Sequence, residues 1–331
     1  MVRHRGWRRA AQIAMPRPSR HAPGFSSLRR IASLLLVPIL AACSNGRSDG
    51  SKESGQPTAE VALDDGLINE SSGLARSQRS SELLWTHNDS GGAAELYGID
   101  LQGHHRVTLR ISGALAVDWE DLSSYTSKGT PYLLIGDMGD NGAIRPVTTY
   151  YRIEEPAITP TDTLQTISVR PSAVYTLIYP DGPRDAESLA VDGQQNMAYV
   201  LSKRDAVPQL YRFSLDSSGP LALPRIMEAL GPITIPRAPA GYTGDVDAYN
   251  WPTAMDFDDS LRRVYVGTLL DGYFYDRADG ESWAQALAHE PSRFDLPDYP
   301  QIEAGSFDRD SRDALYLTSE QLPTPLARLQ P

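Results

Sequence analysis

A short motif that occurs five times along the chain constrains its fold more than any other feature. Each copy starts at an acidic or small polar residue, runs through a few apolar residues, and is followed after a gap by an aliphatic or tyrosine-containing strand that stops in a polar turn. The copies start at Ser72, Glu120, Glu187, Thr253 and Glu303, which gives steps of 48, 67, 66 and 50 residues. One blade cannot bury both faces of its sheet alone, so repeated strand groups at this spacing predict stacked blades.

Candidate third strands alternate apolar and polar residues, as half-buried strands do, and lie at 95–100, 150–153, 209–213, 272–275 and 325–329. The chain after Glu303 has room for three strands only, so residues 60–64 are the predicted donor of the fourth, which would close the ring. We therefore predict an all-β, five-bladed β-propeller over residues 60–331. A sixth blade or extra strands would fit within the two longer steps. A two-sheet sandwich is disfavoured because sandwiches do not repeat a motif in register.

The first 42 residues have the pattern of a secretory signal. They contain eight arginines, no lysine and no acidic residue, and they include an apolar stretch at residues 31–40 that is too short to span a bilayer. Leu40-Ala41-Ala42-Cys43 resembles a bacterial lipoprotein lipobox, which implies cleavage before Cys43 and lipid on that residue. We expect residues 43–59 to be a flexible tether to the membrane. Ser44 favours an outer-membrane or surface location, and Met15 is an alternative start to Met1.

The charge balance excludes some partners. The whole chain has 31 basic and 42 acidic side chains; without the eight arginines of the predicted signal, 23 basic side chains remain against 42 acidic ones, a net charge of −19. Such an excess argues against binding of nucleic acid or of any polyanion unless a cation intervenes. Cys43 is the only cysteine, so no disulfide is expected. We expect a monomer that contacts the membrane only through its lipid.

Carboxylates gather at the starts of the repeated strands. Glu70, Asp118 and Asp185 each lie two residues before a motif start. Residues two apart on a strand point the same way, so these side chains should meet the motif acids at one mouth of the central channel. Oxygen-only ligands suit Ca²⁺. The predicted calcium ligands are Asp118, Glu120, Asp185, Glu187 and Glu303. The alternative is that they cap turns and accept backbone N–H groups.

Polar loops between the second and third strands add further candidates. The predicted ligand-binding residues are Asn88, Asp89, Asp137, Asn141, Lys203 and Arg204. The Lys203 and Arg204 pair is the best contact for an anion, with a solvated loop pair as the alternative. His87 is the one histidine beside the predicted mouth, where it would act as a general base if the protein is an enzyme. A turn histidine bonded to its own loop is the alternative interpretation.

Residues 185–192 and 301–308, with Thr318-Ser319-Glu320, resemble the recurring strand-start motif of the secreted phytase-like and esterase-like β-propeller families. Residues 84–92, 118–121 and 135–141 are similar to a set of bacterial propeller proteins. The resemblance covers roughly residues 68–330. It implies calcium at the channel rim and, in some members, hydrolysis of phosphate esters or lactones. Departures from the active members are Trp251, Thr253 and Ser72 at acidic positions of the motif, and only three lysines after residue 42.

Two functions of different class follow from these patterns. The first is a lipid-anchored, extracytoplasmic binding or scaffold module, which presents its loops to an envelope protein, a glycan or a small molecule. The second is a metal-dependent hydrolase of a phosphoester, ester or lactone, with a rim cation polarising the substrate. The sequence leaves open whether the chain is catalytic.

Overall fold

The structure is a computed structural model that describes residues 55–159, 161–216, 223–238, 242–244 and 246–331. The chain divides into two units, residues 1–50 and 51–331, and all the described strands belong to the second. The described residues form strands almost throughout, with two one-turn helices, α1 (Val246–Tyr249) and α2 (Trp283–Ala286). None of the described helices has the length and apolar character needed to cross a membrane.

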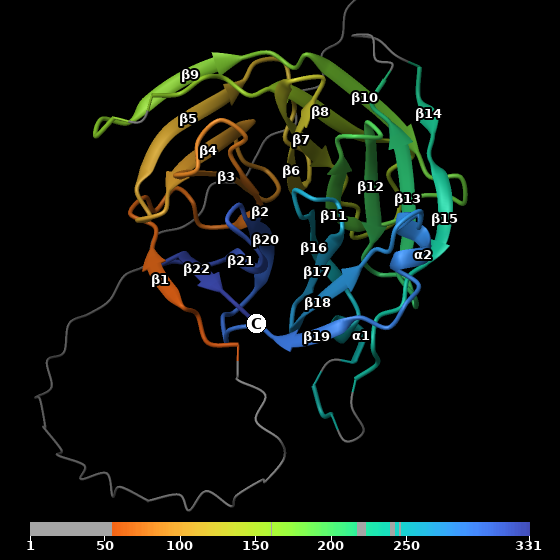
Figure 1. The fold of residues 1–331 in the computed structure, drawn as a ribbon. Helices are drawn as coiled ribbons and strands as arrows, with labels where there is room; N and C mark the ends of the chain where they lie inside the picture. Colours follow the sequence, from red (N-terminus) through yellow and green to blue (C-terminus); the bar gives the residue numbers. More distant parts are fainter. Residues whose placement is uncertain (1–54, 160, 217–222, 239–241, 245) are drawn as a thin grey trace, which may run out of the picture. The chain divides into compact units, whose positions relative to one another are not determined.

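The strands form five sheets, each of which is one blade of a β-propeller (Figure 1). Blade 1 contains β2 (Ser71–Arg76), β3 (Leu83–Asn88), β4 (Glu95–Asp100), β5 (His105–Ile111) and β9 (Gln165–Val169). Blade 2 contains β6 (Trp119–Ser127), β7 (Thr130–Asp137), β8 (Thr148–Glu154), β10 (Ala173–Ile178) and β14 (Arg225–Ile226). Blade 3 contains β11 (Ala186–Asp192), β12 (Met197–Ser202), β13 (Gln209–Ser214) and β15 (Glu228–Pro232). Blade 4 contains β16 (Pro252–Phe257), β17 (Arg263–Thr268), β18 (Asp271–Asp276) and β19 (Ser292–Asp295). Blade 5 contains β20 (Ile302–Asp308), β21 (Ser311–Ser319), β22 (Pro325–Leu329) and β1 (Ala59–Ala62).

The first strand of each blade lines the centre of the ring. β2, β6, β11, β16 and β20 contact one another in that order, and β20 returns to β2 (Figure 1). The apolar core is divided in the same way, because each junction between neighbouring blades has its own cluster of buried side chains. At the junction of blades 3 and 4, for example, Phe257 stacks on Trp283 with ring centroids 4.1 Å apart. Each sheet therefore buries its apolar faces against the neighbouring blades, as the repeat predicts.

The predicted closure of the ring is confirmed. β1 pairs antiparallel with β22, from Ala59 opposite Arg328 to Ala62 opposite Pro325. The backbone N–H of Thr58 adds a hydrogen bond to the carbonyl of Arg328 at 2.7 Å. The segment that we predicted as a tether therefore ends in residues that already bond to the sheet. Pairing of the two ends of the propeller removes an open sheet edge.

The two longer steps of the repeat contain extra strands, not a sixth blade. β9 follows β8 of blade 2 in the sequence but pairs in parallel with β5 of blade 1, from Val107 opposite Gln165 onward. β14 follows β13 of blade 3 and pairs in parallel with β10 of blade 2. Each extra strand thus crosses back to the preceding blade and joins two neighbours through backbone hydrogen bonds.

Candidate functional site

The five motif starts share one backbone feature, a β-bulge. In the first strand pair of every blade the register shifts by one residue, and the residue left without a partner is the motif start itself. The five bulge residues are Ser72, Glu120, Glu187, Thr253 and Glu303. A bulge bends its strand and changes the direction of a side chain. The repeated sequence motif therefore corresponds to a β-bulge that is repeated in every blade at the mouth of the central channel.

Two bulges carry a hydroxyl group and link neighbouring blades. Ser72 Oγ donates to the carbonyl of Glu120 at 2.7 Å, and Thr253 Oγ1 donates to the carbonyl of Ile302 at 3.1 Å. Ser72 thus bonds the bulge residue of the next blade, and Thr253 bonds the residue before the bulge of the next blade. Ser72 and Thr253, which replace an acidic residue of the motif, thus link neighbouring blades by hydrogen bonds. The carboxylates of the other three bulge residues, Glu120, Glu187 and Glu303, are available for other partners.

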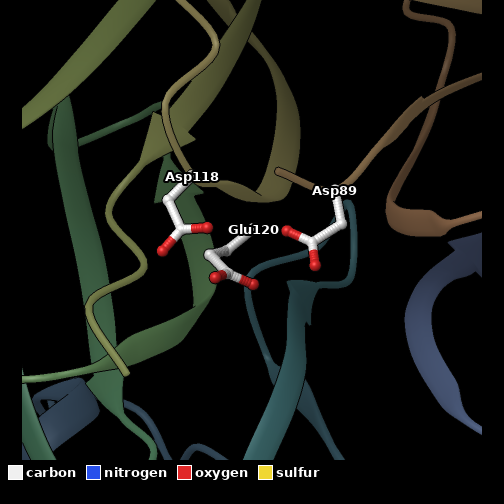
Figure 2. A group of neighbouring side chains, drawn as sticks. All are labelled: Asp89, Asp118 and Glu120. Carbon is white, nitrogen blue, oxygen red and sulfur yellow. The ribbon is translucent and has the colours of Figure 1, made fainter. Parts of the chain in front are cut away.

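Figure 2 shows the first of two acidic groups, formed by Asp89, Asp118 and Glu120. One carboxylate oxygen from each residue lies within 4.8 Å of the others. Asp89 follows β3 of blade 1, whereas Asp118 immediately precedes β6 of blade 2 and Glu120 is its bulge residue. Gly139 makes this approach possible: an added Cβ would lie 1.9 Å from Glu120 Oε1 and 2.6 Å from Asp118 Oδ2.

The second acidic group contains Glu120, Asp185 and Glu187, all of them buried. Because Glu120 belongs to both groups, the five carboxylates are continuous across blades 1 to 3. We call Asp89, Asp118, Glu120, Asp185 and Glu187 the mouth cluster. The sequence predicted Asp118 near Glu120 and Asp185 near Glu187 from strand alternation, but Asp118 and Asp185 precede their strands and the bulges interrupt alternation. The carboxylates do lie close together, and they do so around bulged strand starts and not along regular strands.

Burial and mutual repulsion change the acidity of these groups. Removal from water raises the pKa of Glu120 well above its usual value, and the charges of Glu187, Asp89 and Asp118 raise it further. Burial likewise raises the pKa of Glu187 to about 8 and that of Asp89 to about 6. The pKa of Asp118 is raised mainly by burial. Glu120, Glu187, Asp89 and Asp118 therefore retain protons at pH values where ordinary carboxyl groups are ionised, unless a cation offsets the charge.

Only part of the cluster has a cationic partner. Lys203 is buried, pairs with Glu187, and lies 3.7 Å from Glu303 Oε1. Arg204 Nε donates to Asp185 Oδ2 at 2.7 Å. Among the described residues, no lysine, arginine or histidine forms an ion pair with Asp89, Asp118 or Glu120. Lys203 and Arg204 are thus bound within the protein. The first acidic group has no ion-pair partner in contact, and only the more distant charges of Arg145 and Lys203 lower the pKa values of Asp118 and Glu120.

The remaining candidates have mainly structural contacts. Asn88 Nδ2 donates to the carbonyl of Leu67 at 2.6 Å. Asp137 accepts from the backbone of Val117 and Asp118 and pairs with Arg145 at 2.7 Å. Asn141 accepts a hydrogen bond from Arg204.

His87 is fully buried. Its Nδ1 lies 2.9 Å from the carbonyl of Asn88, and its ring meets Trp119 edge to face at 5.6 Å. Its Nε2 is also buried, so a general-base role has no exposed nitrogen to use. Burial lowers the pKa of His87 to about 4.

Two acidic residues outside the predicted set matter as well. Burial, together with the charge of the neighbouring Glu303, raises the pKa of Glu320 to about 8. Asp121 is buried at the centre of the ring, where it accepts from the backbone of Leu189 at 2.7 Å and of Met255 at 3.4 Å. Asp121 thereby ties β6 to β11 and β16. The acidic run at residues 118–121 was the available signal, but it did not show which carboxylate points inward.

Comparisons with known proteins add little to this description. The chain matches no family profile and no curated protein. A solved structure titled "Crystal structure of Nidogen/Laminin Complex" is similar over 76% of this chain and 73% of that chain, with 11% sequence identity and a TM-score of 0.39. At that score the likeness carries no argument, so the fold rests on the strand pairing of this chain itself.

Proposed function

We propose that this protein is a binding module of the cell envelope, anchored by lipid on Cys43, whose channel mouth binds Ca²⁺ through Asp89, Asp118 and Glu120. The observation that carries the calcium proposal is the first acidic group, which offers three oxygens within 4.8 Å of one another and has no ion-pair partner among the described residues. Oxygen ligands on a hard divalent cation are the chemistry expected of such a set. Asp185 and Glu187 extend the negative field toward Lys203.

A cation at this place would have a structural consequence. Asp89 belongs to blade 1, and Asp118 and Glu120 belong to blade 2, so one ion would join two blades at the mouth. It would also replace protons on groups whose pKa burial has raised. The expected result is a propeller whose loops at the mouth are held rigid for a partner.

Calorimetry with calcium and with a chelator tests the proposal. An ion that binds only the folded chain stabilises it by about 2.7 kcal/mol at a hundredfold excess over its Kd. For a domain of this size that corresponds to roughly 5 to 10 °C in the melting temperature. Glu120→Gln should abolish the response, whereas Glu95→Gln, which removes a carboxylate paired with Arg110 on blade 1, should retain it. A wild-type melting curve indifferent to calcium would refute the metal site.

The hydrolase alternative remains a prediction with less support. It needs a base beside the cation, for which the sequence offered an Asp of the rim or His87, and His87 is buried. Calcium-dependent turnover of p-nitrophenyl phosphate or p-nitrophenyl acetate that is lost in Glu120→Gln would favour the enzyme. Calcium-dependent stability without turnover favours the binding module.

A further inference from the structure

A cavity of about 730 Å³ opens beside the mouth cluster, between blades 3 and 4. Its walls are the loop after β12 (residues 204–208), the segment after β15 (residues 233–235 and 237–238), and α1 with its link to β16 (Val246, Asn250 and Trp251). Hydrogen bonds fix the second wall: Ile233 N–H donates to the carbonyl of Pro208 at 3.0 Å, and Thr234 Oγ1 to that of Ala288 at 2.9 Å. The volume is typical of small-molecule sites.

Part of the wall is apolar and uncovered. Val207 is 45% exposed and Val246 is 56% exposed, and both line the cavity with Ile235 and Trp251. Apolar side chains left open on two facing segments are the usual lining of a ligand pocket. The apolar body of a ligand would remove them from water.

Among the described residues of the lining, one cation has no described charged partner. The guanidinium of Arg204 lies 4.5 Å from the centroid of the Trp251 ring, and Asp185 offsets its charge. Asp205 pairs with Arg184 at 2.7 Å. Arg237 is exposed and has no hydrogen bond or ion pair with another described residue. Within the described lining, the uncompensated charge is therefore the positive one of Arg237.

The cavity also contains a buried hydrogen-bond acceptor without a described partner. Asn250 lines the cavity, and its Oδ1 is buried without a hydrogen-bond partner among the described residues. A buried acceptor without a partner is costly, so a ligand that donates there gains affinity.

We propose that this cavity binds a small organic anion with an apolar ring: the ring lies against Val207, Val246 and Trp251, and a carboxylate or phosphate ester group pairs with Arg237. This site goes beyond the calcium proposal because it uses none of the proposed metal ligands. A single local arginine suits a small anion with one charged group, in contrast to the polyanions that the net charge of −19, calculated without the eight arginines of the predicted signal, disfavours.

The test compares two probes with related ring systems, 1-anilinonaphthalene-8-sulfonate and the uncharged N-phenyl-1-naphthylamine, by fluorescence titration and calorimetry. We expect one saturable site for the sulfonate, with affinity reduced about tenfold in Arg237→Gln, the loss expected for one charge-assisted contact. Arg110→Gln, at an exposed arginine on blade 1, is the matched control and should change nothing. The uncharged probe should not distinguish Arg237→Gln from wild type.

A second variant tests the contact between the probe's ring and the apolar wall of the cavity. Val207→Ser should weaken both probes, whereas Leu164→Ser, at a leucine of similar exposure next to β9, should weaken neither. Equal sulfonate affinity in wild type and Arg237→Gln, or no saturable binding of either probe, would overturn the proposal. A chelator should leave the affinity unchanged, so failure of the calcium site would be recognised separately.

Displacement distinguishes the two anion sources. 1-Naphthoate and 1-naphthyl phosphate share a ring and differ in the anion, so the more effective competitor for the bound sulfonate identifies the preferred group. If neither displaces it, the site is not the organic-anion site proposed.

Discussion

Gly139 shows how one residue without a side chain permits the acidic mouth. Its loop lies against two carboxylates of the first acidic group, and an added Cβ would lie within 3 Å of both Glu120 and Asp118. Both contacts are with the ends of flexible side chains, so these can move away at modest cost in folding free energy. An added methyl group would, however, displace the carboxylates of Glu120 and Asp118 from their positions near Asp89.

Gly139→Ala should therefore weaken calcium binding more than it weakens the fold. We expect the rise in melting temperature caused by calcium to shrink to less than half of the wild-type value. Gly142→Ala in the same loop is the control, since its Cβ would make only ordinary contacts with Ile144. An unchanged calcium response in Gly139→Ala would show that the ion does not lie at this group.

The buried carboxylate of Asp256 predicts a pH dependence of the free energy of unfolding that one variant can test. Burial raises its pKa to about 6, against the lowering effects of Arg76 and of the N–H of Phe307, which donates at 2.9 Å. Because the folded pKa lies above the unfolded one, the folded chain holds the proton more tightly. This group's contribution to stability is complete below pH 4 and is lost as the pH rises toward 6.

Asp256→Asn should remove that loss. The free energy of unfolding of the variant, minus that of wild type, should increase between pH 4 and pH 6 and stay constant above, measured by urea titration in calcium-free buffer. Asp162→Asn, at a fully exposed carboxylate, should show no such increase. A constant difference for Asp256→Asn across this range would mean that Asp256 does not titrate as described.

Among the elements, β1 contributes more than its four residues suggest. Its side chains are largely exposed, so its contribution comes mainly from backbone pairing that covers the edge of β22. Without it, β22 would present unpaired N–H and C=O groups, which is a known route to association between sheets.

A chain starting at residue 63 should therefore melt several degrees below a chain starting at residue 55, and it should self-associate on size-exclusion chromatography. The shorter truncation is the control because it retains every residue of β1. Equal melting temperatures and equal elution volumes would show that the closing strand is dispensable.

β9 and β14 also stabilise the contact between neighbouring blades. Both pair in parallel with the preceding blade, so each connects two blades through the chain as well as through the core. Blades 1, 2 and 3 are joined in this way. Blades 1 to 3 also contribute all five carboxylates of the mouth cluster.

For the molecule as a whole, location is the property that decides which partners it can meet. The predicted lipobox, residues 40–43, lies outside the described residues, so only experiment in cells can test it. Cys43→Ser should move the protein from the detergent-extractable membrane fraction to the soluble or unprocessed fraction. Ser44→Ala is a control that leaves the cysteine in place. A Cys43→Ser protein that stays fully in the membrane would refute lipid anchoring.

The sequence alone indicated five repeated blades, most second and third strands, and the strand that closes the ring; the strand pairing excluded the sixth blade that the two longer steps had left open. These features depend on alternation within a strand and on the spacing between copies, both of which are local and repeated. The pattern Glu95–Asp100, for example, matches β4 residue for residue. The sequence also marked the positions of Glu120, Glu187 and Glu303 as equivalent, because a bulge in every blade preserved the same motif start.

Only the tertiary structure decided how the blades meet. Alternation gives the direction of a side chain on its own strand, but it does not say which distant residue lies opposite. Lys203 joins Glu187 and Glu303 across two blades that are not neighbours in the ring. β9 follows a strand of blade 2 in the sequence but pairs with a strand of blade 1. Residues 204–208 line a cavity together with Trp251. These arrangements follow from ring closure and packing between segments far apart in the chain, which no local pattern encodes.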